Sequence, residues 1–306
     1  MKKLFLKSML CMLIFNVQAQ DTKTEQWDIG GTSRLSFSQV NLTNWSAGGQ
    51  NSLSLNGLAS FHAHKTKGKG LWENFLEVGY GIIKQGESSW IKTDDRIDFT
   101  SKYGHKASGK WSYAALLNFK TQMTDGYNYP NDSIKISGLF SPAYFLESFG
   151  MDFKANEHFN CFIAPITLKA TIVANQDLAN AGAFGVEAAE KDTAGNIIKE
   201  GENTRTEFGG YIRMYYQKDI VENVGINTKL ELFTNYLNNP QYIDINWEVL
   251  LSLKVNKYIS ATLSTQLLYD HDIDIAKDTN GDGVYDSFGP EIQFKEVFGL
   301  GLTYTL

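Results

Sequence analysis

The stretch of the chain with the clearest metal-binding chemistry is Asp278-Thr-Asn-Gly-Asp-Gly-Val-Tyr-Asp286. Carboxylate or amide oxygens recur along it at the spacing of a calcium-binding loop, and they belong to Asp278, Asn280, Asp282 and Asp286. Gly283 stands where such loops turn tightly, and Val284 follows where a backbone carbonyl adds a ligand. The glutamate that usually closes the loop is absent, since Gly289 stands there, so a solvated acidic turn is the alternative. The sequence predicts a structural Ca²⁺ that braces an external loop.

Histidine is the other side chain that could act in catalysis or bind a metal. His271 lies between carboxylates in Tyr269-Asp-His-Asp-Ile-Asp274, a grouping that could activate water as a general base. The alternative is that these residues have no catalytic role, since acidic residues are common in loops near a cation site. His62 and His64 share one strand face at a spacing that permits metal binding, but no third ligand is visible. The chain has no Gly-x-Ser-x-Gly elbow and no phosphate-binding glycine loop. We therefore expect no catalytic residues and no enzymatic activity.

The N-terminus has the features of a secretory signal. Three lysines among the first seven residues precede a short apolar stretch, and Val17-Gln-Ala19 is typical of a cleavage site. These features predict a signal peptide over residues 1–19 and a short periplasmic segment over residues 20–26. After cleavage Cys161 would be the remaining cysteine, so stability must come from backbone pairing and packing rather than from an internal disulfide.

Beyond residue 26, apolar and polar residues alternate in one segment after another, and Gly, Asn, Asp or Lys clusters bound each segment. None of them approaches the roughly 18 consecutive apolar residues of a membrane helix. The sixth segment is the weakest, because Pro142 interrupts it and proline belongs at a strand edge or a bulge. The pattern predicts about twelve strands, at 27–39, 51–64, 71–84, 91–106, 109–123, 133–147, 157–171, 203–219, 222–237, 241–256, 258–270 and 291–306.

The lengths of the strands and of their links favour a transmembrane barrel over a β-sandwich. Strands of about 13 to 16 residues exceed the roughly five or six usual in soluble sheets. Aromatic residues gather at both predicted ends, as they do at the two interfaces of a membrane. If the N-terminus is periplasmic, every long link lies on the outer side of the membrane. The links on that side are 40–50, 85–90, 124–132, 172–202, 238–240 and 271–290. We predict an all-β fold, a transmembrane antiparallel up-and-down β-barrel spanning residues 27–306, in the cell outer membrane.

The last nine residues, Phe298-Gly-Leu-Gly-Leu-Thr-Tyr-Thr-Leu306, place an apolar side chain at every second position. An aromatic residue two positions before an apolar C-terminus resembles the β-signal by which bacterial outer-membrane barrels are recognised. The expected partners are therefore outer-membrane lipid and the barrel assembly machinery. The net charge of −6 is modest and no basic stripe indicates nucleic acid.

Several segments carry a more specific resemblance: Asn44 to Leu55, Trp72 to Gly81, Ser101 to Gly104, Asn227 to Asn239, Ile243 to Glu248 and Gln293 to Gly299. In these segments the chain resembles the Bacteroidota outer-membrane proteins grouped as domain of unknown function (DUF) 3078. The resemblance spans nearly all of the chain after the predicted signal peptide. It implies a source lineage and a barrel, but no substrate and no catalytic residue.

Strand parity predicts which charged side chains face the lumen. Both signs occur among them, so they either pair into a polar plug or line a narrow aqueous path. We expect passive passage or binding of a small polar solute, and the alternative is a non-enzymatic structural or accessory subunit of an outer-membrane assembly or secretion complex. The predicted lumen residues are Glu77, Arg96, Asp98, Lys102, Lys120, Lys169, Glu207, Arg213, Lys229, Glu231, Glu248, Lys254 and Lys295.

The longest predicted link, 172–202, divides into two halves. Its Ala-rich first half, Ala179 to Ala189, is expected to form a short helix or to fold into the barrel mouth. Its second half, Glu190 to Asn203, is charged and contains glycine, which is typical of a mobile loop. Long loops in compact folds are often functional.

Overall fold

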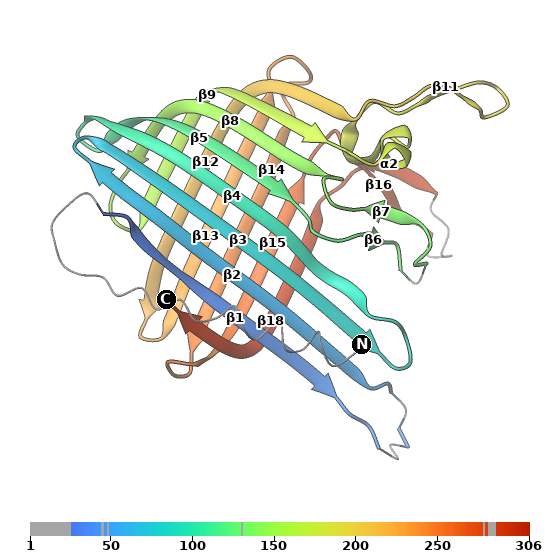
Figure 1. The fold of residues 1–306 in the computed structure, drawn as a ribbon, viewed down its shortest axis with the longest axis horizontal. Coiled ribbons are helices and arrows are strands. Elements are labelled where there is room, and N and C mark those ends of the chain that lie inside the picture. Colours follow the sequence, from blue (N-terminus) through green and yellow to red (C-terminus); the bar gives the residue numbers. More distant parts are fainter. Residues whose placement is uncertain (1–25, 44–45, 48, 130, 278, 281–285) are drawn as a thin grey trace.

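The computed structural model describes residues 26–43, 46–47, 49–129, 131–277, 279–280 and 286–306, and the predicted signal peptide lies outside them. Its main feature is a closed barrel of antiparallel strands in the order β1-β18-β15-β14-β13-β12-β9-β8-β5-β4-β3-β2 (Figure 1). The predicted twelve-strand, up-and-down architecture is confirmed. The strand bounds are Asp28–Val40 (β1), Ser52–Lys67 (β2), Gly70–Gln85 (β3), Ile91–Ser108 (β4), Trp111–Thr121 (β5), Ala143–Lys154 (β8), Phe159–Ile172 (β9), Thr204–Val221 (β12), Val224–Asn235 (β13), Ile243–Lys254 (β14), Ile259–Tyr269 (β15) and Gln293–Thr305 (β18).

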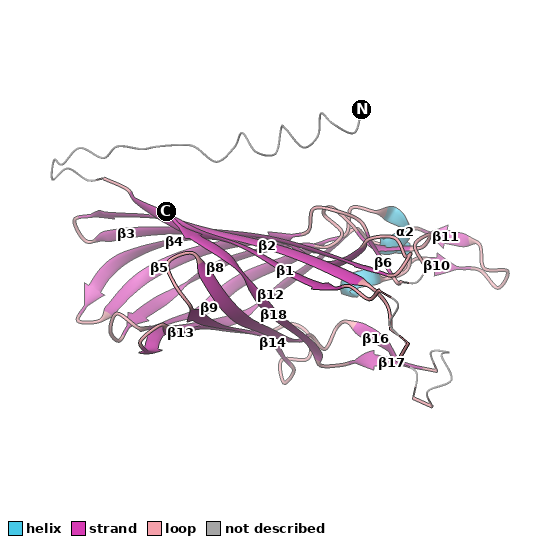
Figure 2. Cartoon of the chain, turned by 90° about the horizontal axis from the view of Figure 1, so that it is seen from below, coloured by secondary structure: helices cyan, strands magenta, loops and turns pink. Residues whose placement is uncertain are grey.

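The remaining described elements are short and lie in the links between barrel strands (Figure 2). Three two-stranded ribbons pair β6 with β7, β10 with β11 and β16 with β17. No helix in the described part of the chain is long and apolar enough to cross a membrane. The bounds are Gly126–Tyr127 (β6), Lys135–Ser137 (β7), Gln176–Asn180 (α2), Ala183–Gly185 (η1), Glu190–Lys191 (β10), Ile197–Lys199 (β11), Asp274–Lys277 (β16) and Ser287–Pro290 (β17).

The two ends of the barrel differ in the length of their links. We call one the turn end, where β1 begins and β18 ends and where the links are 68–69, 109–110, 155–158, 222–223 and 255–258. The other is the loop end, with links 41–51, 86–90, 122–142, 173–203, 236–242 and 270–292. All three ribbons and α2 lie at the loop end, on the right in Figure 1. The predicted separation of long and short links is therefore confirmed.

The sixth strand was predicted wrongly. The sequence indicated 133–147, whereas β8 spans Ala143–Lys154, directly after Pro142. Ile134 and Ile136 alternate like strand residues, but both are exposed in the loop-end link. The predicted turn at 148–156 contains Ser148 and Asp152, whose polarity suggested a turn, although both are buried in the lumen wall.

Gly150 gives a physical reason for the irregular sequence of β8. A Cβ atom built on Gly150 would lie 2.0 Å from the backbone oxygen of Ile163 on β9, far inside contact distance. The β8–β9 register shifts between Phe149 and Met151, so a bulge brings the two backbones together at this point. Glycine is needed here for close approach rather than for a turn.

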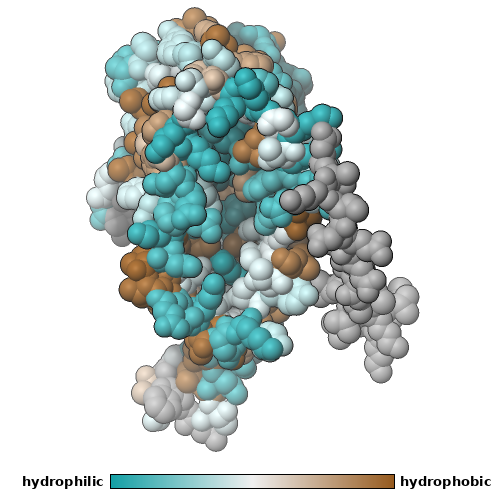
Figure 3. Space-filling model, turned by 90° about the vertical axis from the view of Figure 1, so that its left-hand side faces the viewer, coloured by the Kyte–Doolittle hydropathy of each residue, from teal (hydrophilic) through white to brown (hydrophobic). Residues whose placement is uncertain are grey.

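The barrel is polar inside and apolar outside, the reverse of a soluble β-sandwich. Asp98, Glu207, Lys229 and Glu231 are buried on the inner face of the wall. Seen from the turn end, hydrophilic residues cover much of the surface, and hydrophobic residues lie among them and along its edges (Figure 3). Large apolar side chains are exposed on the outer face, among them Leu35, Phe37, Tyr113, Phe149, Ile163, Trp247, Phe298, Leu300 and Leu302.

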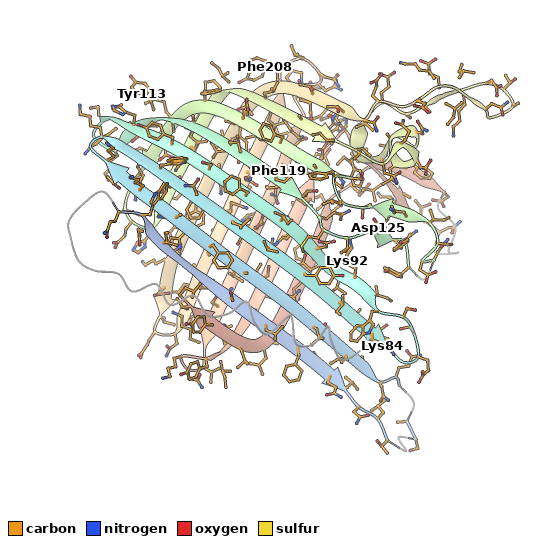
Figure 4. All side chains as sticks on the ribbon, viewed as in Figure 1. Lys84, Lys92, Tyr113, Phe119, Asp125 and Phe208 are labelled. Atoms are coloured by element: carbon orange, nitrogen blue, oxygen red, sulfur yellow. The ribbon has the colours of Figure 1, made fainter. Side chains whose placement is uncertain are left out.

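Aromatic side chains gather at both ends of the wall, as predicted. Trp72 and Trp111 stand within the first residues of β3 and β5 at the turn end, where they contact Trp27 and Phe153, with ring centroids 5.3 and 4.7 Å apart. Figure 4 shows Tyr113 near the turn end of the wall and Lys84 near the loop end. At the loop end, the ring centroids of Phe208 and Tyr236 lie 6.0 Å apart.

The long link 173–203 carries a small core of its own. Val173, Leu178, Ala179 and Val186 are buried together, which fixes α2 and η1 over the loop end. The side chain of Asn175 accepts a hydrogen bond from Leu178 N–H and caps α2. The helix α2 lies mostly before the Ala-rich half predicted to be helical, Ala179 to Ala189, which contains only the end of α2 and the short turn η1. The charged second half, predicted to be a mobile loop, contains the β10–β11 ribbon.

Candidate functional site

Charged side chains fill the middle of the lumen, and most of them form ion pairs. Lys229 of β13 lies 3.2 Å from Asp98 of β4 and 3.1 Å from Glu248 of β14, measured from its Nζ atom. Lys120 of β5 contacts Glu231 of β13 at 2.6 Å. We call these five residues the central network. They come from four strands, so the network depends on closure of the barrel.

Neutral side chains complete the hydrogen bonding of the central network. The Tyr211 hydroxyl donates to Glu231 at 2.6 Å, and the Asn246 amide donates to the other carboxylate oxygen at 2.8 Å. The Asn118 amide donates to Asp98 at 2.6 Å. Burying an ion costs several kcal/mol unless it is paired and hydrogen-bonded. These partners therefore hold the charged groups in place across the lumen.

The central network joins opposite walls of the barrel. In the closed strand order β14 is fourth and β4 is tenth, which places them six positions apart in a ring of twelve. Arg96 of β4 nevertheless lies 3.6 Å from Glu248 of β14. An ion pair between diametrically opposite strands divides the lumen at this level. Any solute must pass beside the pair.

Two further clusters of ion pairs flank the central network. At the loop end, Lys169 lies 2.6 Å from Asp244 and 3.4 Å from both Glu207 and Asp270. Arg205 in turn lies 3.0 Å from Glu207. At the turn end, Lys102 lies 2.9 Å from Glu73 and 3.0 Å from Asp152. Paired charges therefore recur along the whole lumen.

Three cavities follow the lumen beside these ion pairs. The turn-end cavity, about 150 Å³, is lined by Lys102 and Asp152. The middle cavity, about 270 Å³, is lined by Glu77 and Lys229. The loop-side cavity, about 50 Å³, lies nearer the loop end and is lined by Asp94 and Lys295.

The cavities share lining residues, so they form one series. Arg213 and Tyr215 line both the turn-end and the middle cavity. Arg34, Arg96 and Glu248 line both the middle and the loop-side cavity. Arginine side chains thus lie where neighbouring cavities meet, and each cavity has room for water. The arrangement offers space and polar partners for small polar molecules.

Most of the predicted lumen residues are found there. The exception is Lys254, the last residue of β14, which is exposed at the turn end. The structure adds charged groups that the sequence did not indicate: Arg34, Glu73, Asp94, Asp152, Arg205, Asp244, Asp270 and Asp272. Glu73, Asp94 and Arg205 share the parity of predicted neighbours on their own strands, which could have identified them. Asp152 was missed because β8 was misplaced.

The predicted calcium site falls largely outside the described residues, which exclude Asp278, Asp282 and Val284. Asn280 and Asp286 are described, and Asp286 accepts hydrogen bonds from the Thr279 hydroxyl at 2.7 Å and from its backbone N–H at 3.0 Å. These bonds lower the pKa of Asp286. Within the described ranges, no three His, Cys, Asp or Glu side chains are grouped closely enough to hold a metal ion. The calcium site stays a prediction.

The histidines lie in separate places. His271 stacks on Tyr242, with ring centroids 3.6 Å apart, and lies 3.3 Å from the Tyr269 hydroxyl. Its neighbours Asp270 and Asp272 both pair with Arg205, at 3.8 and 3.3 Å, so they belong to the loop-end cluster of ion pairs. His62 and His64 have ring centroids 4.9 Å apart, and His64 packs against the Phe75 ring.

Comparison with known proteins gives a family-model match over part of the chain and a set of similar solved structures. The family model described as "Protein of unknown function (DUF3078)" matches residues 37–127, so the resemblance seen in the sequence is confirmed over that range. No curated protein matches the chain.

Among solved structures, the chain is similar to the NanC porin, at 11% identity and a TM-score of 0.38, over 90% of this chain and 99% of that one. It is similar to an outer membrane channel from Pseudomonas putida F1, at 11% identity and a TM-score of 0.39, over 94% and 99% of the two chains. The translocator domain of the autotransporter NalP from Neisseria meningitidis follows, at 11% identity and a TM-score of 0.31, over 92% and 89%.

Proposed function

We propose that the chain spans the outer membrane, with the turn end in the periplasm and the loop end outside the cell. The exposed apolar outer face supports this placement, because a closed barrel satisfies its backbone hydrogen bonds within the wall and can face lipid. The aromatic side chains at both ends suit the two membrane interfaces. Long loops outside and short turns inside are the usual asymmetry of such barrels.

Within that setting, the function we propose is passive passage or binding of small polar solutes in the lumen, without catalysis. The main support for this function is the series of three cavities. Each cavity shares lining residues with its neighbour, and these residues are Arg34, Arg96, Arg213, Tyr215 and Glu248. A barrel that served only as a structural subunit would need no connected polar space. The central network limits the passage, since it joins opposite walls.

Single-channel recording in planar lipid bilayers tests this function. The unmodified protein should show small, discrete openings, because the central network leaves only the side passage. Glu248→Ala should raise the unit conductance, since it removes the partner of both Arg96 and Lys229. Lys199→Ala is a matched control. Lys199 lies in the β10–β11 ribbon at the loop end, away from the lumen, and forms an ion pair with Glu187.

Two outcomes would contradict the proposal. One is a silent barrel in which Glu248→Ala also produces no openings. The other is a silent barrel that co-purifies with stable protein partners, which would favour the accessory role instead.

A further inference from the structure

The barrel wall is only partly closed between its first and last strands. β1 and β18 pair over five residues, from Thr32 opposite Thr305 to Ser36 opposite Gly301. Beyond Ser36, residues 37–40 of β1 pair with β2 alone. Residues 293–300 of β18 likewise pair with β15 alone. Within the described chain the two strands thus separate toward the loop end, as Figure 1 also shows.

Two glycines mark the point where the strands separate. A Cβ atom built on Gly301 would lie 2.1 Å from the backbone oxygen of Leu35, and one on Gly299 would lie 2.8 Å from the Ser36 hydroxyl. Only glycine permits so close an approach. β1 therefore crosses tightly over β18 at this point and then diverges from it.

The loop-side cavity lies directly beside this opening. Ser36 of β1 and Lys295, Val297 and Gly299 of β18 line it. The side chain of Lys295 is 41% exposed, whereas those of the lumen residues Lys102 and Lys229 are 12% and 10% exposed. Lys295, the third residue of β18, is therefore much more accessible than the lysines deeper in the lumen.

The lining of the cavity is both cationic and apolar. Arg34, Arg96 and Lys295 supply positive charge, and the Nε atoms of Arg34 and Arg96 are buried without a hydrogen-bond partner in the described chain. Lys295 and Arg96 have carboxylate partners, in Asp94 and Glu248, but no described carboxylate lies within ion-pair distance of Arg34. Within the described chain, the Arg34 guanidinium donates a long hydrogen bond of 3.4 Å to the Ser252 hydroxyl.

Apolar side chains complete this lining on both sides of the wall. Leu58, Leu250 and Val297 line the cavity from within. Phe37, Phe298 and Leu300 are exposed on the outer face beside the opening. The cavity is therefore cationic and apolar inside, and the outer face beside the opening is apolar.

We propose that the loop-side cavity binds the carboxylate head of a single-chain fatty acid, which enters sideways from the bilayer between β1 and β18. The head group pairs with Arg34, and the chain lies between Leu58, Leu250 and the outer apolar residues. This proposal goes beyond the small polar solutes proposed above, because a fatty acid is an amphiphile that would reach the same lumen from the bilayer. A charge-assisted hydrogen bond to a buried arginine supplies the specificity.

A disulfide that closes the opening tests lateral entry. If the β1–β18 register continued, Gln39 would face Phe298, so Gln39→Cys with Phe298→Cys is made in full-length protein carrying Cys161→Ala. The control pair is Thr32→Cys with Thr305→Cys, two residues that already face each other. Laurate binding is measured in lipid nanodiscs by displacement of a fluorescent fatty acid, before and after oxidation.

Lateral entry predicts that oxidation of the 39/298 pair weakens laurate binding by about tenfold or more and that reductant restores it. The 32/305 pair should bind laurate equally in both states. Val297→Trp, which fills the cavity beside the opening, should have the same effect as the disulfide. Unchanged laurate binding in both the oxidised 39/298 protein and Val297→Trp would overturn the proposal.

A second arm tests the head group. Arg34→Ala should weaken laurate binding about tenfold or more, and Arg34→Lys should restore part of it, because lysine keeps the positive charge that pairs with the carboxylate. Butyrate, which is water-soluble, should bind equally whether the opening is closed or not. Ion conductance recorded on the same proteins separates the two proposals. Normal conductance without laurate binding would overturn only lateral entry, whereas loss of conductance and of all solute binding would overturn both.

Discussion

At the scale of single residues, the lumen is held by charges that depend on one another. Lys229 lies between Asp98 and Glu248; Lys229 and Asp98 are buried, and Glu248 is partly buried. Strand parity identified these residues in the sequence, because a charge on the polar face of a long alternating strand must face inward. Parity could not tell which charges meet, since partners such as Arg96 and Glu248 stand on opposite walls.

Removing one partner of the central network should therefore destabilise the barrel. Lys229→Met leaves Asp98 and Glu248 without their shared cation, and we expect a loss of about 3–5 kcal/mol in the free energy of unfolding. The measurement is urea-induced unfolding from lipid vesicles. Lys199→Met, at an exposed ion pair in the loop-end ribbon, should change the same quantity by less than about 1 kcal/mol. Similar values for the two variants would show that the network is solvated rather than buried.

At the scale of elements, the sequence located eleven of the barrel strands to within three residues at each end. β8 was the exception. Ser148, Gly150 and Asp152 are residue types that are common in turns, although Ser148 and Asp152 face the lumen and Gly150 lies at a bulge within the strand. The incomplete pairing of β1 with β18 was also not predictable. Apolar and polar residues alternate along the whole length of both strands, so the pattern gives no sign of the divergence. The divergence depends on where two glycines allow the backbones of β1 and β18 to cross.

The close approach at Gly150 makes a prediction for β8. Gly150→Ala places a Cβ against the Ile163 carbonyl, so we expect a loss of about 1–3 kcal/mol and a lower yield of folded protein. Gly104→Ala is the matched control, because its Cβ would meet nothing nearer than 3.8 Å. Refolding yield in detergent, read by heat-modifiable gel mobility, compares the two. Equal yields would mean that β8 and β9 are not this close.

The C-terminal residues matter for closure because the β1–β18 contact is so short. Deleting Tyr304 to Leu306 removes two of its five residue pairs and the hydrogen bond from Leu306 N–H to the Gly31 carbonyl. Unpaired backbone in lipid costs several kcal/mol per group, so we expect no folded barrel in the membrane. Heat-modifiable gel mobility of membrane fractions shows the outcome. Tyr304→Ala, which keeps the backbone pairs, should still fold, and a folded truncated protein would contradict the account.

The loop between β16 and β17 carries the calcium prediction. If Asp278, Asn280, Asp282 and Asp286 bind Ca²⁺, a chelator should leave several carboxylates to repel one another and speed proteolysis within 271–290. The barrel should persist, since the β16–β17 ribbon lies outside its wall. Protease digestion in detergent, with calcium or with chelator, is the measurement, and Asp282→Ala should remove the difference. If calcium does not change the rate of digestion of the unmodified protein, the motif is a solvated acidic turn and not a calcium site.

At the scale of the whole molecule, the account depends on an inverted arrangement of side chains. Charged residues face a common interior, and large apolar residues face outward around the closed wall. Period-two alternation predicted this arrangement for β14, where Trp247 and Asn246 fall on opposite faces. What alternation could not supply is the shape of the lumen, because that depends on contacts between distant strands.

Refolding of two neighbouring variants into lipid vesicles tests this arrangement most directly. Trp247 is exposed on the outer face, and Asn246 donates a hydrogen bond to Glu231 in the lumen. Trp247→Arg should cost about 2–4 kcal/mol of unfolding free energy, since it places a charge against lipid. Asn246→Arg should be much milder, because the new charge faces water and carboxylates. Equal penalties for the two substitutions would contradict an outer face in lipid and a polar lumen within.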